Sequence, residues 1–237
     1  MSRHYPEYHP ESDMLLEYSA GNLPWAQSLA VSAHLQLCPH CRQQHQQLNR
    51  VGGSLLEQCT PQSVDSSVLQ RLMGRIDSSE EPDINAEAPE QKTASTAPER
   101  RIGNDPALAE LPQVIHKIVK RNLPLKWRRI SPALKATRLK TGQDKYEVAF
   151  HRICRGGRTA EHDHRGEEII VVLHGSFSDA DGVYKQGDFL VRRPGEVHRP
   201  IATEDQECLC LSVVEAPVNV TGMLGWLVNP FLSFRPG

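Results

Sequence analysis

Two neighbouring stretches decide the fold of the C-terminal half of this chain: residues 156–177, GGRTAEHDHRGEEIIVVLHGSF, and residues 187–198, GDFLVRRPGEVH. The first contains two histidines separated by one residue. Side chains of a strand alternate between its faces, so both imidazoles lie on the same face. A glutamate follows four positions later, and the second stretch ends in a third histidine. Three imidazoles and one carboxylate suit Zn, Mn, Fe or Ni. We therefore predict a metal site formed by His162, His164, Glu168 and His198.

The sequence around these stretches has the period of strands. Apolar residues alternate with other residues from position 146 to 151, and residues 207–214, ECLCLSVV, form a further short apolar run. Turns that contain Gly, Asp or Pro separate the segments. Short strands at this spacing indicate an antiparallel sandwich or barrel.

Glycines at fixed distances from the four ligands complete a two-motif pattern. They are Gly156, Gly175, Gly187 and Gly195. The pattern resembles the cupin family over roughly residues 106–237. The second motif departs from the usual one, because Pro194 and Gly195 are adjacent and Ala202 stands where an Asn is usual. These departures weaken the expectation of a generic cupin-enzyme activity more than the expectation of metal binding.

The N-terminal part has the period of helices. Residues 10–13 precede a first helix that Gly21 and Asn22 end, and Pro24 opens PWAQSLAVSAHLQL. A third helix is predicted over about 41–56. A fourth, DSSVLQRLMGRI, has one apolar stripe formed by Val68, Leu69, Leu72, Met73 and Ile76. Fewer than 80 residues of short helices make a small core, which usually needs a metal, a disulfide or a partner.

The segment HLQLCPHC, residues 34–41, supplies such a metal site. His34 and Cys38 share one face of a helix, and Cys38 and Cys41 are two residues apart, which lets both sulfurs reach one ion. His9 is the best fourth ligand if the first two helices pair antiparallel; His4, His40 and His45 are alternatives. Two imidazoles and two thiolates suit Zn²⁺. A redox CxxC is less favoured, because thioredoxin-type motifs follow a strand.

The arrangement H-x24-H-x3-C-x2-C, with LLEYSAGNLP between, resembles the zinc-binding anti-sigma domain. Joined to a cupin, it is most similar to the ChrR type of anti-sigma factor. The resemblance implies that His9, His34, Cys38 and Cys41 bind zinc, giving two Zn²⁺ per chain with the cupin site. It also implies that residues 1–77 bind a group IV (extracytoplasmic function) sigma factor and keep it from RNA polymerase. The stripe on the fourth helix would then contact the partner, although self-packing remains open for half of it.

The composition separates these two parts. Residues 78–99 hold six acidic residues and one lysine, and read as a mobile acidic linker. We predict an α + β protein of two domains: a zinc-stapled helical bundle over 1–77, a linker over 78–105, and an antiparallel β-barrel or sandwich, the cupin, over 106–237.

Two of the six cysteines form a second close pair, Cys208-x-Cys210. ChrR-type proteins carry a Cys-x-Cys at the matching place, so a redox role and a role as small buried apolar side chains are equally open. For Cys59 and Cys154 we favour the buried structural role. The resemblance implies that the cupin senses an oxidative signal, such as singlet oxygen, and releases the sigma factor.

Other function classes stay open. A metal-dependent dioxygenase or isomerase could use the cupin ligands, with the helical segment as an oligomerisation module. A zinc-dependent nucleic-acid binder could use the basic run over 113–143, although a solvated face that attracts acidic chains is favoured. The net charge of −2 argues against a general polyanion binder. No stretch has the length of apolar residues that a bilayer requires, and no signal peptide is visible, so we expect a cytoplasmic regulator without enzyme activity, direct DNA binding or membrane contact.

Overall fold

The computed structural model describes residues 5–78, 105–142, 144–221 and 236. The chain forms two compact units. One comprises residues 1–51 together with 100–237, and the other comprises residues 52–99. The helical N-terminal segment as far as Val51 therefore belongs to the same unit as the strands. The domain boundaries at residues 77 and 105 remain predictions. Most of the predicted linker, residues 79–104, lies outside the described residues.

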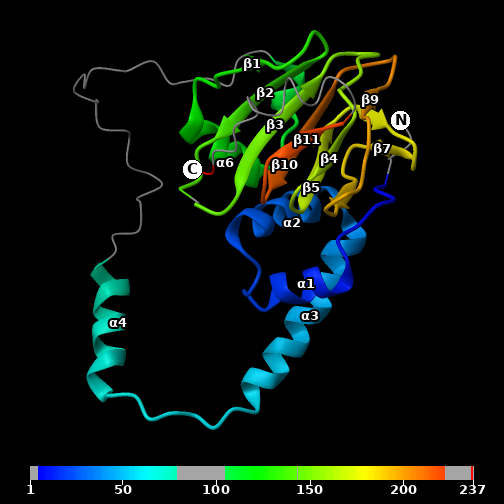
Figure 1. Cartoon of the computed structure of the whole chain (residues 1–237). Coiled ribbons are helices and arrows are strands. Elements are labelled where there is room, and N and C mark those ends of the chain that lie inside the picture. Colours follow the sequence, from blue (N-terminus) through cyan, green and yellow to red (C-terminus); the bar gives the residue numbers. More distant parts are fainter. Residues whose placement is uncertain (1–4, 79–104, 143, 222–235, 237) are drawn as a thin grey trace, which may run out of the picture. The chain divides into compact units, whose positions relative to one another are not determined.

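The larger unit is built on antiparallel strands, as predicted (Figure 1). Its main sheet has six strands in the order β1 (Arg128–Arg129), β2 (Leu134–Leu139), β3 (Glu147–Ile153), β10 (Cys208–Val214), β5 (Glu168–His174) and β8 (Phe189–Arg192). A three-stranded sheet comprises β7 (Val183–Lys185), β6 (Ser176–Ser178) and β9 (Ile201–Ala202). A two-stranded sheet pairs β11 (Val218–Val220) with β4 (His162–His164).

The central strands β5 and β10 are buried on both faces, so their sequences are almost continuous runs of apolar residues. In β5 and β10, alternate residues belong to two different clusters, as the period of two requires. One cluster, which includes Val171, Leu209 and Leu211, also contains the buried residues of the helices. The other includes Val172, Cys208, Cys210, Phe177 and Tyr184, and fills the inside of the barrel. The main sheet therefore has one face toward the helices and one toward the barrel interior.

The four predicted helices lie close to their predicted positions, and they are α1 (Ser12–Ser19), α2 (Trp25–Leu37), α3 (Pro39–Glu57) and α4 (Ser66–Ser78). Two further helices, α5 (Pro106–Ala109) and α6 (Gln113–Asn122), precede the strands. Pro24 precedes the first residue of α2 by one position. The short helix α5 and the strands β1 and β2 were not predicted from the sequence.

The small helical core is completed by the barrel. Helix α2 buries side chains on several sides, among them Ala26, Leu29, Val31 and Leu35. It packs against α1, against α6, and against β5 and β10 of the main sheet. The partner that the N-terminal helices require is therefore, in large part, the sheet of the same chain.

The smaller unit contains the end of α3 and the whole of α4. The apolar stripe of α4 is exposed: Leu69 is 64% exposed and Leu72 is 51% exposed. Among the described helices, none is both long and apolar enough to cross a bilayer.

Candidate metal centres

The first predicted quartet of ligands meets at the corner between α2 and α3. His34 lies in the last turn of α2, and the backbone leaves the helix at Cys38 with extended φ and ψ angles of −110° and 106°. Pro39 then opens α3, which places Cys41 in its first turn. The donor atoms of His9, His34, Cys38 and Cys41 all lie within 4.8 Å of one another.

The donors of this cluster face one another. Nδ1 of His9 lies 3.5 Å from Sγ of Cys38 and 3.4 Å from Sγ of Cys41. The backbone N–H of Cys41 donates to Sγ of Cys38 over 3.4 Å. Burial, and then the neighbouring Cys38, raise the pKa of Cys41, so a bound cation is what would hold the sulfur of Cys41 as a thiolate.

His34 has the tautomer that a metal ligand needs. Its Nδ1 lies 2.7 Å from the carbonyl oxygen of Gly187, and because a carbonyl only accepts, Nδ1 carries the proton. Nε2 then has a free lone pair, is buried, and has no hydrogen-bond partner among the described residues. Burial lowers the pKa of His34 to about 4, against the opposing effect of the Gly187 hydrogen bond, so the imidazole is neutral at neutral pH. An orphaned buried nitrogen in a cluster that also holds two sulfurs fits a divalent cation.

The alternative fourth ligands lie elsewhere. His45 bonds Ser19 through Nδ1 and Asn49 through Nε2, so both of its nitrogens are engaged. His40 is exposed, and its ring centroid lies 5.3 Å from that of His9, outside the cluster. His4 lies outside the described residues. His9 is therefore the histidine that the fold brings to the corner.

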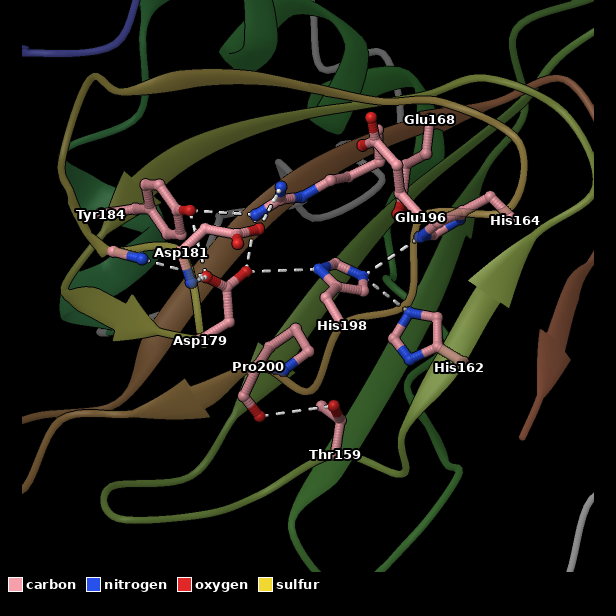
Figure 2. A network of polar contacts seen from close by, with 12 residues as sticks. Thr159, His162, His164, Glu168, Asp179, Asp181, Tyr184, Glu196, His198 and Pro200 are labelled. Atoms are coloured by element: carbon pink, nitrogen blue, oxygen red, sulfur yellow. Dashed lines mark hydrogen bonds and ion pairs between the residues drawn. The ribbon is translucent and has the colours of Figure 1, made fainter. Parts of the chain in front are cut away.

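The second predicted quartet meets inside the barrel. His162 and His164 lie on β4, and His198 pairs with His162 through two backbone hydrogen bonds of 3.1 and 3.0 Å. Glu168 begins β5, and the donor atoms of all four residues lie within 4.8 Å of one another. In Figure 2 the three imidazoles point toward one another from β4 and from the loop that carries His198.

The three imidazoles converge through Nε2. The Nε2 atoms of His164 and His198 are 3.1 Å apart, and those of His198 and His162 are 3.0 Å apart. Nδ1 of His162 donates to the carbonyl of Ala160 over 2.9 Å, and Nδ1 of His164 lies 3.4 Å from a Glu168 oxygen. With Nδ1 protonated, every Nε2 presents a lone pair to the same point. Such convergence is stable around a cation, so these residues also fit a metal.

Burial and neighbouring groups shift the pKa values of the barrel cluster. Burial lowers the pKa of His198 to about 4, and the neighbouring His162 adds to the effect. Burial alone would raise the pKa of Glu168, but the nearby His164 and His151 and the hydroxyl of Ser212 lower it overall. The Ser212 hydroxyl donates to Glu168 over 2.5 Å. Glu168 is therefore an ionised carboxylate, able to bind a cation or to orient His164.

Sequence reasoning missed a buried network behind His198. Oδ2 of Asp179 lies 3.5 Å from Nδ1 of His198 (Figure 2). Arg192 donates to the same oxygen over 2.6 Å. The hydroxyl of Tyr184 donates to Oδ1 of Asp179 and accepts from Arg192. Asp181 pairs with the other guanidinium nitrogen of Arg192 over 3.0 Å. Asp179 and Asp181 belong to an SDADG segment that reads as an ordinary turn, so no local signal marks them.

The cysteine pair lies beside this cluster. Cys208 and Cys210 are both buried. Their sulfurs are 3.5 Å apart, which is a hydrogen-bond distance between two thiols and too long for a disulfide. The hydrogen bond from Cys208, then burial, raise the pKa of Cys210. Ser212 follows on the same face of β10 and bonds Glu168, so the two thiols and the metal cluster share one side of one strand. Cys59 and Cys154 are exposed, so the predicted burial of these two was wrong.

Comparison with known proteins covers nearly the whole chain. The family model of the ChrR cupin-like domain matches residues 116–217. The Anti-sigma-E factor ChrR of Cereibacter sphaeroides is 31% identical over 226 residues, which cover 94% of this chain and 97% of that protein.

A solved structure gives the same result for the fold. A chain of the crystal structure of Rhodobacter sphaeroides SigE in complex with the anti-sigma ChrR is similar with a TM-score of 0.67 and 26% identity. The similarity covers 88% of the present chain and 98% of the other.

Proposed function

This chain belongs to the family of ChrR anti-sigma factors, and on that premise we propose that it binds a group IV sigma factor and keeps it from RNA polymerase. The observation that carries the proposal is the length of the match. The similarity to a protein named an anti-sigma factor extends over 94% of the chain, and so includes both the helical segment and the barrel. The family is one of regulators, which agrees with the expectation that the chain is not an enzyme.

The surface proposed to bind the sigma factor is the stripe on α4. Val68, Leu69, Leu72, Met73 and Ile76 lie on one face and are exposed. Exposed apolar faces of this kind mark sites where another protein docks. A helix that lays such a face into a groove contributes contacts at positions i, i+3, i+4 and i+7, which is the spacing found here.

We propose zinc as the metal of both clusters. For the N-terminal cluster the argument is its donor set of two imidazoles and two thiolates. For the barrel cluster, three imidazoles and a carboxylate also suit Mn, Fe or Ni, so zinc is argued there only from the resemblance. A bound cation at either cluster would supply positive charge that stabilises the facing lone pairs.

The barrel is proposed to sense the signal that releases the sigma factor. Its cluster lies beside two reduced, buried thiols, Cys208 and Cys210, on one face of β10. An oxidant such as singlet oxygen or an organic peroxide would act on such a group of ligands and sulfurs. A sigma factor acts on RNA polymerase, so the same proposal puts this chain in the cytoplasm.

The test is co-expression of the full chain with each candidate sigma factor of its host, followed by purification and metal analysis. We expect one sigma factor to co-purify at one to one, two zinc ions per chain, and repression of a reporter that depends on that sigma factor. A chain that binds no sigma factor but turns over a small substrate with its barrel metal would establish the enzyme alternative. Binding to nucleic acid that weakens steeply with salt would establish the third class.

A further inference from the structure

The segment that carries His9 is fixed to the barrel by backbone hydrogen bonds. The N–H groups of Glu7 and Tyr8 both donate to Oδ1 of Asp188, over 2.7 and 3.1 Å. The N–H of Phe189 then donates to the carbonyl of Tyr8 over 3.0 Å. These partners are about 180 residues apart in the chain, yet they set the position of the residue that directly precedes His9.

Asp188 is built into this contact. It is 1% exposed, and its second oxygen, Oδ2, accepts from the N–H of Lys185 over 2.7 Å. Both carboxylate oxygens are therefore used: one closes the turn between β7 and β8, and the other holds the N-terminal segment. The ring of Tyr8 adds an edge-on contact with Tyr184 of β7, with centroids 4.8 Å apart.

The same turn also holds a second ligand of the N-terminal cluster. Its Gly187 carbonyl accepts from Nδ1 of His34, which is 153 residues away and fully buried. Gly187 has a φ of +94°, and a Cβ added there would come within 2.6 Å of Cγ of Pro6 and 3.3 Å of Cβ of Leu37. The absence of a side chain at Gly187 is what lets the N-terminal segment and α2 approach the turn so closely.

We propose that the turn Lys185–Phe189 is the outer support of the N-terminal metal site, and that the docking of the barrel sets how firmly that metal is held. The inference rests on the zinc site proposed above. The turn fixes the tautomer and direction of His34 through Gly187, and it fixes the approach of His9 through Asp188. Mutation of groups that orient metal ligands typically costs about 10- to 100-fold in metal affinity.

One consequence is a thermodynamic link between the barrel and the helical corner. If docking strengthens metal binding, then the metal strengthens docking by the same factor. A change in the barrel that loosens the turn would weaken the binding of the metal that joins α2 to α3. This would hold even though none of the proposed ligands of that metal comes from the barrel.

The experiment uses the full chain with Co²⁺ in place of the native metal. Among the proposed ligands only Cys38 and Cys41 are thiols, so the thiolate-to-cobalt charge-transfer band reports the N-terminal site alone. The decay of this band is followed after addition of excess EDTA. The variants are Gly187→Ala and Asp188→Ala, which disturb the contact, and Tyr8→Ala, which leaves the barrel sequence unchanged. The matched control is Gly142→Ala: that glycine also has a positive φ, +73°, but no atom lies within 4 Å of an added Cβ.

We expect the band to decay at least tenfold faster in Gly187→Ala and Asp188→Ala, severalfold faster in Tyr8→Ala, and at the unaltered rate in Gly142→Ala. Unaltered decay in Tyr8→Ala and in whichever of the two turn variants folds would overturn the inference. Equal acceleration in Gly142→Ala would also overturn it, because strain anywhere in the barrel would then suffice. If the unaltered chain gives no thiolate band at all, the proposed N-terminal metal site itself is wrong, and this inference falls with it.

Discussion

The two candidate metal sites of this chain, with their proposed ligands, are built in opposite ways. The helical cluster takes three ligands from eight consecutive residues at a helix corner, but a group that orients one of them, Gly187, comes from the barrel. The barrel cluster draws its ligands from β4, β5 and a distant loop, and its orienting groups, such as Asp179 and Ser212, belong to the barrel as well. The ligands of the helical cluster are thus close in sequence but are oriented by a residue far along the chain. The ligands of the barrel cluster are dispersed in sequence but are oriented by residues of the same barrel.

The largest effect should follow from removing a thiolate of the helical cluster. In Cys38→Ala we expect one metal per chain to be lost and sigma-factor binding to disappear, because structural zinc binding in small domains is worth about 10 kcal/mol of folding energy. Metal analysis and co-purification measure both. Cys59→Ala, at an exposed cysteine, is the matched control and should behave as the unaltered chain does. If Cys38→Ala kept two metals per chain, Cys38 would not be a ligand and the proposed helical metal site would be wrong.

Removing a barrel ligand should separate binding from release. His164→Ala or His198→Ala should cost one metal while the chain still represses the sigma-dependent reporter, since α4 and the helical cluster are unaltered. Induction by singlet oxygen or an organic peroxide should be absent. His174→Ala, a histidine on β5 outside the cluster, serves as control. Normal induction in the two ligand variants would mean that the barrel metal is not part of the sensor.

A charge placed on the stripe of α4 should weaken the complex by an intermediate amount. For Leu72→Asp we expect a loss of about 1–2 kcal/mol, roughly five- to thirtyfold in Kd, as for a central apolar contact of an interface. The control, Gln70→Asp, adds the same charge off the stripe. Titration calorimetry with the purified sigma factor measures the difference, and equal Kd values for the two variants would exclude the stripe as the binding surface.

The network behind His198 should have a smaller effect that is confined to the barrel. Asp179→Asn removes the charge that faces His198, and we expect about a tenfold loss of barrel-metal affinity. Asp181→Asn is matched, because Asp181 also pairs with Arg192 but its side chain is 65% exposed and it is not among the groups found next to His198. Competition with a metal-binding dye compares them. Equal losses of metal affinity in the two variants would mean that the loss comes from the lost pairing with Arg192 and not from the lost contact with His198.

The smallest effect is expected from the thiol pair. Cys208→Ala removes one buried sulfur, and we expect it to reduce induction by peroxide without abolishing it, while both metals stay bound. The reporter assay and metal analysis on the same preparation check this. Loss of the barrel metal in Cys208→Ala would show instead that the sulfur is part of the packing that supports the ligands.

The sequence was sufficient for the elements whose signal is local. Six of the eight proposed ligands lie in two short motifs, residues 34–41 and 162–168, whereas His9 and His198 lie 25 and 30 positions from the nearest of them. The four N-terminal helices follow from caps and apolar periodicity. Strand β2 was missed because Leu134–Leu139 lies in a basic run that reads as a solvated surface. Asp188 was missed for a different reason: its partners Glu7 and Tyr8 are about 180 residues away, so no window of sequence contains both. His151, on β3 near Glu168, lies outside both motifs.

The exposed stripe of α4 also bears on the energetics of the complex. A helix of 13 residues is only marginally stable by itself in water, so under the proposed docking most of its order would come from the surface that it binds. Binding would then include a folding step, with a negative change in heat capacity and a part of the contact energy spent on ordering the helix. The net affinity is therefore smaller than the buried area suggests. A complex held in this way is stable when undisturbed, yet a change of a few kcal/mol in the chain is enough to shift it from bound to free.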